Sequence, residues 1–368
     1  MNAAKPKLLF IITGLGLGGA ERQLCDLADG FYHRNCDVKI ISLTGNGICR
    51  PAEKNINIVS LGLSKNPLSF LRTYIQARKI IKIYRPDVIH SHMYHANIFS
   101  RLLRLTVRIR YLITTAHNKN EGGRGRMLAY RMTNFLSDIT TNVSQEAVDS
   151  FISQGAFNKN DIIPIYNGID INKFHYDSSW RDYIRNTLGI EPKTPLLVAV
   201  GRLTEAKDYP NLLNAFSLVN VNPLPVLAIV GTGTLESSLK ELAKELKVEN
   251  RVFWLGARHD VEKWYSACDL FILSSQWEGF GLVVAEAMAS EALVVVTDAG
   301  GVAEIVDDSE FVVPTSNSLA LAKKINQVLT YDKVKVDKIR KDNRRKIVEK
   351  FSLESAIQKW LSLYKVEQ

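Results

Sequence analysis

The stretch LSSQWEGFGLVVAEAMASEALVVVTDAGGVAEIV, from Leu273 to Val306, decides the fold that we expect for the rest of the chain. It predicts the end of a strand, a turn with two glycines, a helix, an apolar strand and a second glycine turn that opens another helix. Gly279 and Gly281 free the backbone on either side of Phe280, so amide groups there can turn toward a ligand. The run after Gly281 is rich in helix formers, and a helix N-terminus favours anions because its first N–H groups lack partners. The stretch therefore predicts an anion site at the start of this helix.

Two glutamates lie at different positions along this stretch, one in the predicted helix and one in the loop before it. Glu286 lies roughly 7.5 Å along the predicted helix at 1.5 Å per residue, which is about the distance from a bound pyrophosphate to its ribose. Helical side chains lean toward the N-terminus, so we expect Glu286 to point back at the ligand. Glu278 lies in the loop before the helix. The pair predicts one acceptor for ribose hydroxyls and one near a sugar.

With these motifs the chain resembles the retaining glycosyltransferases of family 4. The residues that carry the resemblance are EGFGL (278–282), EAM (286–288) and TDAGG (297–301), and the spacing of the two glutamates is the best-known mark of that family. The resemblance implies the GT-B architecture, an α/β fold of two facing Rossmann-like doubly wound domains with a cleft between them. An ordinary buried helix with two surface carboxylates is the alternative. Implied donor contacts here are Gly279, Phe280, Gly281, Leu282 and Glu286.

Length and composition are those of a soluble protein with two domains. The chain has 368 residues, of which 46% are hydrophobic and 23% charged, as is ordinary for globular proteins. Its four cysteines form no CxxC pair, which indicates reduced thiols and a cytoplasmic setting. No apolar run reaches the length of a membrane span.

The net charge of +9 is concentrated in the first half of the chain. Residues 1–170 hold 22 Lys and Arg against 12 Asp and Glu, whereas the remainder holds 25 against 26. We find no nucleic-acid-binding motif, and we favour an anionic membrane surface, where each clustered cation contributes about 1 kcal/mol. A solvated helix face is the alternative. In the run from Arg101 to Arg110 we expect the arginines to reach solvent. Much of the excess lies in Arg72, Arg78, Lys79, Lys82, Arg85, Arg101, Arg104, Arg108, Arg110, Arg124, Arg126 and Arg131.

Strand patterns alternate with helix patterns along the chain, which predicts parallel, doubly wound sheets. We expect a Rossmann-like acceptor-binding domain over residues 1–172 and a Rossmann-like nucleotide-sugar-binding domain over residues 173–350. By resemblance to the family, residues 351–368 form a closing helix that packs back on the first domain.

The first glycine loop, GLGLGG at residues 14–19, formally matches the dinucleotide fingerprint. That fingerprint needs an acidic residue at the end of the second strand, and the strand predicted over residues 37–43 ends without one. An NAD-dependent oxidoreductase stays open as an alternative. The run GGAER that begins at Gly18 resembles the first loop of family 4. The resemblance implies that Gly18 and Gly19 let the backbone approach substrate phosphate or sugar.

Four histidines follow predicted strands of the first half. His90 and His92 are expected on one face of a strand, with His95 just beyond. No carboxylate or cysteine completes a metal shell there, so we expect these residues to line an acceptor site at the strand ends. His117 occupies the matching place after the next strand, and the family resemblance implies that it lies against the donor sugar. A hydrogen-bonded structural histidine is the alternative.

Two cations mark the first loop of the second half. Arg202 and Lys207 lie five residues apart between a predicted strand and a helix that starts near Tyr209. A guanidinium fork and an ammonium point charge at such a turn suit a diphosphate, and a plain surface pair is the alternative. The octapeptide 201–208 resembles the phosphate loop of family 4, which adds Gly201 to the predicted site.

Two later turns carry weaker assignments, and one turn departs from the family pattern. By resemblance, Gly231, Arg258 and Val261 wall the nucleotide base. Glu291 and Leu293 stand where the family usually has glycine and proline, so we expect a slightly different turn after the Glu286 helix.

These observations predict a metal-independent nucleotide-sugar transferase without a cofactor. Cleavage of the sugar–phosphate bond puts negative charge on the leaving diphosphate, which a metal or fixed cations must stabilise. No Asp-x-Asp occurs in the sequence, which removes the usual manganese anchor of the other major transferase fold. We therefore expect Arg202 and Lys207 to stabilise the diphosphate, with Glu278 and His117 completing the catalytic set.

The predicted donor is a UDP-sugar, or alternatively a GDP-sugar, carrying a hexose or N-acetylhexosamine that is transferred with the retention implied by the resemblance. The predicted acceptor is a lipid-linked oligosaccharide or a surface polysaccharide such as O-antigen or capsule. We expect a cytoplasmic protein, peripheral on the inner face of the membrane, that binds no nucleic acid. A non-catalytic nucleotide-sugar-binding scaffold on the membrane stays open, although it would have lost one of the site residues and none is missing.

Overall fold

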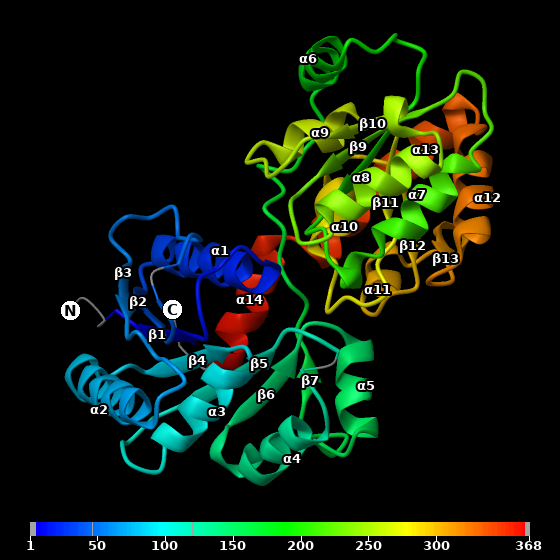
Figure 1. Ribbon diagram of the computed structural model, residues 1–368. Coiled ribbons are helices and arrows are strands. Elements are labelled where there is room, and N and C mark those ends of the chain that lie inside the picture. The colour runs from blue at the N-terminus through cyan, green and yellow to red at the C-terminus, as the bar shows by residue number, and fades with distance from the viewer. Residues whose placement is uncertain (1–4, 46, 120, 365–368) are drawn as a thin grey trace. The chain divides into compact units, whose positions relative to one another are not determined.

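The computed structural model describes residues 5–45, 47–119 and 121–364, which form two compact units (Figure 1). The first unit comprises the residues up to Gly168 together with the C-terminal helix that begins at Leu353. The second unit is Ile169–Ser352. The predicted boundaries lay at 172/173 and 350/351. Ile169 belongs to the second unit because its N–H donates to the Phe351 carbonyl at 2.8 Å.

The first unit is built on a sheet of seven parallel strands in the order β3-β2-β1-β4-β5-β6-β7. The central strands β4 and β5 are buried along their whole length, as expected for a parallel sheet covered on both faces. The strands are β1 (Lys7–Ile12), β2 (Asp37–Ser42), β3 (Asn57–Ser60), β4 (Val88–His92), β5 (Leu112–Ala116), β6 (Ile139–Asn142) and β7 (Ile163–Pro164).

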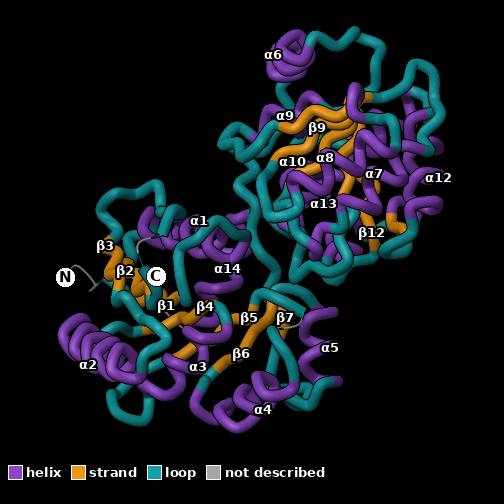
Figure 2. Tube along the Cα trace, in the orientation of Figure 1, coloured by secondary structure: helices purple, strands orange, loops and turns teal. Residues whose placement is uncertain are grey.

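The period-two alternation of β1 divides the core of this unit into two layers. Phe10 faces the layer that holds α1 and the C-terminal helix α14, whereas Leu9 and Ile11 face the layer that holds α2 and α3. Figure 1 shows α1 and α14 on one side of the sheet and α2, α3 and α4 on the other, and Figure 2 shows the same strands between the helices. The helices are α1 (Gly19–His33), α2 (Pro67–Tyr84), α3 (Tyr94–Leu103), α4 (Arg124–Thr133), α5 (Gln145–Ser153), α14 (Leu353–Tyr364) and the 3₁₀ turn η1 (Asn134–Leu136).

The prediction that the arginines in the run from Arg101 to Arg110 reach solvent is wrong for Arg101. This side chain on α3 is fully buried, and it donates to Thr114 Oγ1 at 2.9 Å and to Thr140 Oγ1 at 2.7 Å. The Tyr130 carbonyl accepts a further bond at 3.1 Å. These neutral acceptors bond the two terminal nitrogens of the guanidinium, while Nε is buried without a partner among the described residues. Burial lowers the pKa of Arg101 to about 10. Arg101 therefore ties α3 and α4 to the sheet.

The second unit has a sheet of six parallel strands in the order β10-β9-β8-β11-β12-β13. The strand order reverses between β8 and β11, the point at which open α/β sheets bind ligands. The strands are β8 (Leu196–Val200), β9 (Val226–Val230), β10 (Val252–Trp254), β11 (Leu270–Leu273), β12 (Val294–Thr297) and β13 (Val312–Val313). The helices are α6 (Ser178–Leu188), α7 (Tyr209–Ser217), α8 (Glu236–Glu245), α9 (Val261–Ala267), α10 (Leu282–Ala289), α11 (Val302–Val306), α12 (Ser318–Leu329) and α13 (Lys333–Lys350), with the 3₁₀ turns η2 (Glu205–Lys207), η3 (Glu249–Arg251) and η4 (Ser309–Phe311).

The predicted sequence of elements over residues 273–306 is confirmed, because β11, α10, β12 and α11 follow one another as expected. The fold class, two Rossmann-like α/β domains with a C-terminal helix that returns to the first, is confirmed as well. None of the helices that the structure describes has the length and apolarity needed to span a bilayer.

The turn after α10 ends in a left-handed residue. Glu291 has φ of 60°, the region that glycine adopts at little cost. The Glu291 N–H donates to the Met288 carbonyl at 3.1 Å, and the Ala292 N–H donates to the Ala287 carbonyl at 3.0 Å. This pair of bonds is the Schellman arrangement, which places its left-handed residue at this point.

Candidate active site

Two loops of the second unit are joined where β8 and β11 end. The loop of residues 201–208 follows β8, and the loop of residues 274–281 follows β11. The Gln276 N–H donates to the Ala206 carbonyl at 2.9 Å, and the Ser274 hydroxyl donates to the Lys207 carbonyl at 2.8 Å. The two predicted site segments are therefore held side by side at the switch point of the sheet.

Lys207 and Glu278, 71 positions apart in the chain, form an ion pair across these loops. Both side chains are largely buried, at 18% and 14% exposure, and the Ser275 hydroxyl donates to the same Glu278 oxygen at 2.7 Å. An ammonium has three donors, and a single hydrogen bond from Lys207 is given to Glu278 in the described structure. Glu278 thus orients Lys207 and leaves it the capacity to donate to a ligand oxygen.

Arg202 lies in the same loop and differs from Lys207 in its surroundings. Its side chain is exposed, and within the described part of the chain its guanidinium has no ion pair or hydrogen bond. The loop is anchored below this residue, where the Tyr209 hydroxyl donates to the Gly201 carbonyl at 3.1 Å. Burial raises the pKa of Tyr209, and the nearby charge of Glu278 adds to that rise, so its hydroxyl is a donor at neutral pH.

Gly231 joins the loop after β9 to the loop after β8. Its φ is 142°, and a Cβ at this position would lie 1.9 Å from the Gly201 carbonyl oxygen. Its N–H donates to the Gly256 carbonyl at 2.8 Å, which adds the loop after β10. A side chain at residue 231 would therefore displace the backbone of the predicted phosphate loop.

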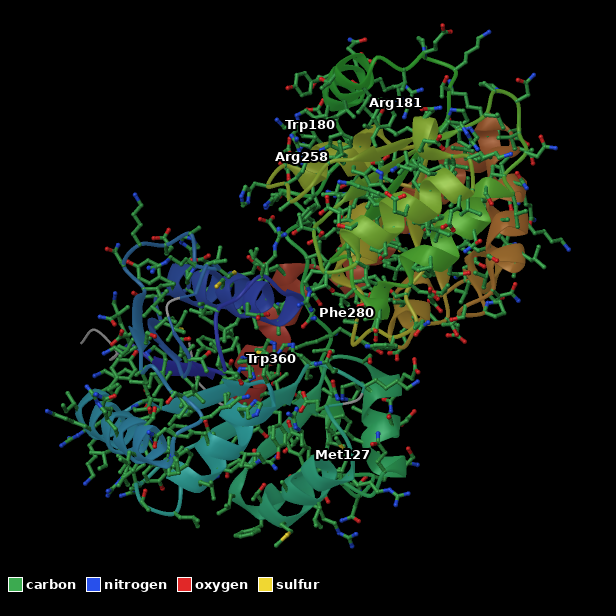
Figure 3. The ribbon with its side chains drawn as sticks, in the orientation of Figure 1. Met127, Trp180, Arg181, Arg258, Phe280 and Trp360 are labelled. Atoms are coloured by element: carbon green, nitrogen blue, oxygen red, sulfur yellow. The ribbon has the colours of Figure 1, made fainter. Side chains whose placement is uncertain are left out.

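The anion site was predicted at the first turn of α10, and anion binding there stays a prediction. Gly281, with φ of 96°, is the N-cap, and a Cβ there would lie 2.8 Å from the Val302 side chain. Phe280 is buried and packs its ring against Phe351 at a centroid distance of 5.8 Å, so its side chain belongs to the core of the second unit (Figure 3). The first residue of the helix, Leu282, follows directly, as predicted.

Glu286 is buried near the middle of α10. The Tyr265 hydroxyl of α9 donates to its Oε2 at 2.9 Å. Sequence reasoning missed Tyr265, since nothing near residue 265 indicates that α9 packs against α10. The predicted role of Glu286 toward a ribose stays a prediction.

The segment that is predicted to contact the nucleotide base contains a second ion pair. Arg258 donates from Nε and Nη2 to the two carboxylate oxygens of Asp260, both at 2.7 Å, and its guanidinium lies 5.5 Å from the centre of the Trp264 ring. This hydrogen bonding lowers the pKa of Asp260. Figure 3 labels Arg258 at the surface of the second unit. Val261 is buried as the first residue of α9. Asp260 and Trp264 were not among the predicted residues.

Asp208 is a further residue that sequence reasoning missed. It has φ of 45° and caps α7, with its Oδ1 accepting from the Asn211 N–H at 3.3 Å. Its Oδ2 accepts from the Ser316 hydroxyl at 3.0 Å and from the Gln276 amide at 3.3 Å. The sequence signal that could have identified Asp208 was its position in the octapeptide 201–208.

The remaining predicted residues belong to the first unit. Gly18 is the N-cap of α1, and Gly19 is its first residue. His117 follows β5, and its Nε2 lies 2.9 Å from His92 Nδ1. His90 lies beside His92, and we call His90, His92 and His117 the histidine cluster. Burial lowers the pKa of all three, to about 4 for His117.

Among the described residues, no group of three or more His, Cys, Asp or Glu side chains is arranged to hold a metal ion. His95 lies apart on α3. Whether His90 and His92 contact an acceptor stays a prediction.

Comparison with known proteins gives matches over most of the chain. The family described as "Glycosyl transferases group 1" matches residues 181–346, and "Glycosyltransferase Family 4" matches residues 17–173. An uncharacterized glycosyltransferase of Haemophilus influenzae is 27% identical over 96% of this chain and 98% of its own length. The UDP-Gal:alpha-D-GlcNAc-diphosphoundecaprenol alpha-1,3-galactosyltransferase of Escherichia coli is 25% identical over 80% of this chain and 79% of its own length. The crystal structure of Anabaena HepE in complex with UDP has a TM-score of 0.84 at 24% identity and covers 98% of this chain and 99% of that chain.

Proposed function

Since the chain belongs to the family 4 glycosyltransferases, we propose that it transfers a hexosyl or N-acetylhexosaminyl group from a nucleoside diphosphate donor with retention of configuration. A UDP-sugar is the favoured donor, and a GDP-sugar is the second choice. HepE, which is similar to this chain in fold, binds UDP. The proposed acceptor is a lipid-linked oligosaccharide or a surface polysaccharide of the O-antigen or capsule type. The name of the Escherichia coli relative, which acts on a diphosphoundecaprenol substrate, supports that choice.

The observation that carries this proposal is that the loop with Arg202 and Lys207 is bonded, at the switch point of the second sheet, to the loop with Glu278 that leads into α10. Transfer breaks the bond between the anomeric carbon and a diphosphate oxygen, and the electron pair leaves with the diphosphate. Arg202 offers a planar fork for that charge, and Lys207 offers a point charge whose position Glu278 holds. The first N–H groups of α10 add a favourable dipole. In this proposal Glu278 also accepts from sugar hydroxyls, and Glu286 accepts from the ribose.

We propose that fixed cations take the place of a divalent ion in this reaction. The acceptor hydroxyl attacks from the side of the leaving group, and its proton passes to the departing phosphate. We expect EDTA to leave the release of nucleoside diphosphate from donor unchanged. Turnover that vanishes in EDTA and returns with manganese overturns the proposal of metal independence.

A thermal-shift screen against UDP, GDP, ADP and their sugars tests the donor, with NADH as the probe for the oxidoreductase alternative. Binding at 100 times the dissociation constant stabilises the folded state by about 2.7 kcal/mol, which is measurable as a raised Tm. Arg202→Met should lose most of this shift. The control is Lys244→Met, which removes an exposed cation of α8 that pairs with Glu241 and should keep the full shift. A Tm raised by NADH and untouched by every nucleotide sugar contradicts the proposal, and so does a nucleotide-sugar shift without any transfer to saccharide acceptors.

We further propose that the protein acts on the inner face of the cytoplasmic membrane, docked by the α2 and α4 side of its first unit. Along α2, Leu68, Leu71 and Ile75 follow at intervals of three and four residues and are more than half exposed. Lys79 and Lys82 continue the same line and are exposed too.

Helix α4 and the 3₁₀ turn η1 that follows it repeat this combination of apolar and basic side chains. Leu128, Met132 and Phe135 are exposed at intervals of four and three residues, beside the exposed cation Arg131. Apolar side chains that enter a bilayer interface and cations that meet anionic headgroups stabilise the same docked state. A solvated face, the alternative, does not explain exposed phenylalanine and leucine side chains in two such rows.

A basic hollow of about 740 Å³ lies at the C-terminal end of α2 and suits a lipid phosphate. Apolar side chains and four cations line it together. The lining residues are Ile81, Lys82, Arg85, Pro86, Val107, Arg108 and Arg110.

Flotation with vesicles of anionic and zwitterionic phospholipid tests this docking. We expect binding to anionic vesicles that weakens with salt and falls at least tenfold in Leu71→Glu/Leu128→Glu. The matched control is Leu319→Glu, because Leu319 is exposed to 71% on α12 of the second unit. Equal loss in the control, or no binding to anionic vesicles at low salt, overturns the proposed docking without touching the donor assignment.

A further inference from the structure

His92 and His117 form a buried hydrogen-bonded pair across neighbouring strands of the first unit. His92 is the last residue of β4 and is 1% exposed, and His117 follows β5 and is 8% exposed. His92 Nδ1 and His117 Nε2 are 2.9 Å apart, which is a hydrogen-bonding distance. The two rings therefore share one contact in which one nitrogen donates and the other accepts.

Both imidazoles are neutral at neutral pH, since burial lowers the pKa of each well below the ordinary value for histidine. A neutral imidazole has one N–H donor and one acceptor nitrogen. A single proton consequently lies between the two rings, and two arrangements are open. Either His92 Nδ1–H donates to His117, or His117 Nε2–H donates to His92.

The other nitrogen of His92 decides between these arrangements. His92 Nε2 is buried and has no hydrogen-bond partner among the described residues. If His117 were the donor, His92 would carry its own proton on Nε2 and bury an N–H without an acceptor. Orphaned buried N–H groups are rarer than under-satisfied acceptors, and such a group costs about 1–3 kcal/mol. The arrangement with His92 Nδ1–H as donor leaves only an unused lone pair.

We infer that His92 is a positioning residue that donates from Nδ1–H to His117 Nε2 and thereby holds His117 in the tautomer with its proton on Nδ1. His117 then presents an N–H donor, and a ligand oxygen such as a sugar hydroxyl or a phosphate oxygen is the chemical class that it binds. The functional part of this inference rests on the proposed transferase activity.

The surroundings of His92 keep its ring from turning over. The His90 ring lies against it at a centroid distance of 4.0 Å, and the Phe10 ring lies at 5.8 Å. His90 is itself held at both nitrogens, with Tyr364 Oη at 2.7 Å from Nδ1 and Thr115 Oγ1 at 2.6 Å from Nε2. A packed ring with fixed neighbours presents the same nitrogen to His117 throughout. This explains two of the strand histidines without a metal.

Nitrogen-15 NMR of the histidine-labelled full chain tests the inference without reference to activity. Long-range proton–nitrogen correlation distinguishes a protonated ring nitrogen from an unprotonated one, and the His92→Asn and His117→Gln variants assign the two rings. We expect His92 and His117 each to carry the proton on Nδ1. A proton on His117 Nε2 overturns the inference and leaves the proposed transfer reaction intact.

Turnover of nucleotide sugar supplies the second readout. In His92→Asn the side-chain amide can donate from the place of Nδ1, whereas His92→Leu cannot donate. We expect kcat to fall about tenfold or more in His92→Leu and to stay within threefold of the native value in His92→Asn, with similar Tm values. The control is His33→Asn, because His33 is an exposed residue of α1. Equal loss in both His92 variants indicates a packing role alone and overturns the inference, as does no loss in either.

Discussion

Replacing Lys207 by methionine separates what this side chain does for folding from what it does for catalysis. Methionine keeps much of the length of the lysine stem and removes the ammonium. Glu278 would then keep the hydrogen bond from the Ser275 hydroxyl and lose its ion-pair partner. The same change takes away one of the two cations that we assign to the leaving diphosphate.

The structure gives a magnitude for each effect. Because Glu278 is 14% exposed, loss of its partner leaves a mostly buried carboxylate under-satisfied, which costs about 1–3 kcal/mol of stability. Removing one preformed group that stabilises developing charge costs about 2.7–4 kcal/mol, or about 100- to 1,000-fold in kcat. The double variant Lys207→Met/Glu278→Gln removes both charges, so we expect it to recover most of the lost stability and none of the lost turnover.

Urea denaturation and steady-state release of nucleoside diphosphate measure the two effects on the same three proteins. A purely structural ion pair predicts that stability and turnover recover together in the double variant. A folded Lys207→Met protein with turnover within threefold of the native value would refute the assignment of Lys207 to the diphosphate.

Three other features of the molecule can be tested by stability or binding measurements. The histidine cluster stays neutral when folded, so its contribution to stability is present above pH 6.5 and is lost as pH falls toward 4, where the unfolded chain binds protons that the folded unit does not. We expect the free energy of unfolding to drop by about 6 kcal/mol between pH 7 and pH 5, because each of the three histidines contributes about 1.4 kcal/mol for every pH unit below its ordinary pKa of about 6.5. Tryptophan fluorescence, to which the first unit contributes Trp360, follows this unfolding. Gly231→Ala should abolish the Tm shift caused by the donor, because its Cβ would overlap the phosphate-loop backbone, whereas Gly189→Ala, also at positive φ but in open space, should keep that shift. Glu291→Gly should raise the free energy of unfolding by about 0.5–1 kcal/mol in urea denaturation, because glycine relieves the left-handed strain at the end of α10.

Each of these outcomes has a clear opposite. A flat stability profile between pH 7 and pH 5 would mean that the histidine cluster takes up protons without unfolding. A full donor shift in Gly231→Ala would mean that the contact with the phosphate loop is not needed for binding. A destabilised Glu291→Gly protein would mean that the glutamate side chain contributes more than its strained backbone costs.

The fold could be predicted from local patterns because each helix and strand has its own hydrophobic periodicity and its own start and stop signals. The stretch from β11 to α11 shows this most clearly, since apolar strands, glycine turns and helix formers follow one another in a single run of sequence. The register of the parallel strands and the return of α14 depend on contacts between distant segments. The return of α14 was expected only from the family resemblance.

The site could be predicted in its residue types and not in its pairings. Arg202, Lys207 and Glu278 were identified by motif, yet the ion pair between the last two joins positions 71 residues apart. Arg101 was predicted to reach solvent and is buried. A charged residue in an arginine-rich run indicates the surface unless its hydrogen-bond acceptors are known. Those acceptors, such as Thr114 and Thr140, come from strands that only the folded sheet places beneath it.

The site that we propose for a diphosphate contains an ion pair with no net charge. Lys207 and Glu278 together contribute no net charge, so we propose that the exposed Arg202 and the start of α10 supply the standing attraction for the donor. Transfer adds negative charge to the diphosphate as the sugar leaves. An ammonium that already has one carboxylate partner keeps further N–H donors for that new charge, and its position is set before the reaction begins. Such a group is oriented in advance, and its hydrogen bonds strengthen only as the bond to the sugar breaks. It therefore lowers the activation barrier more than it raises the affinity for the donor. We therefore propose that Glu278 contributes to catalysis chiefly by holding Lys207 where the leaving oxygen will need it.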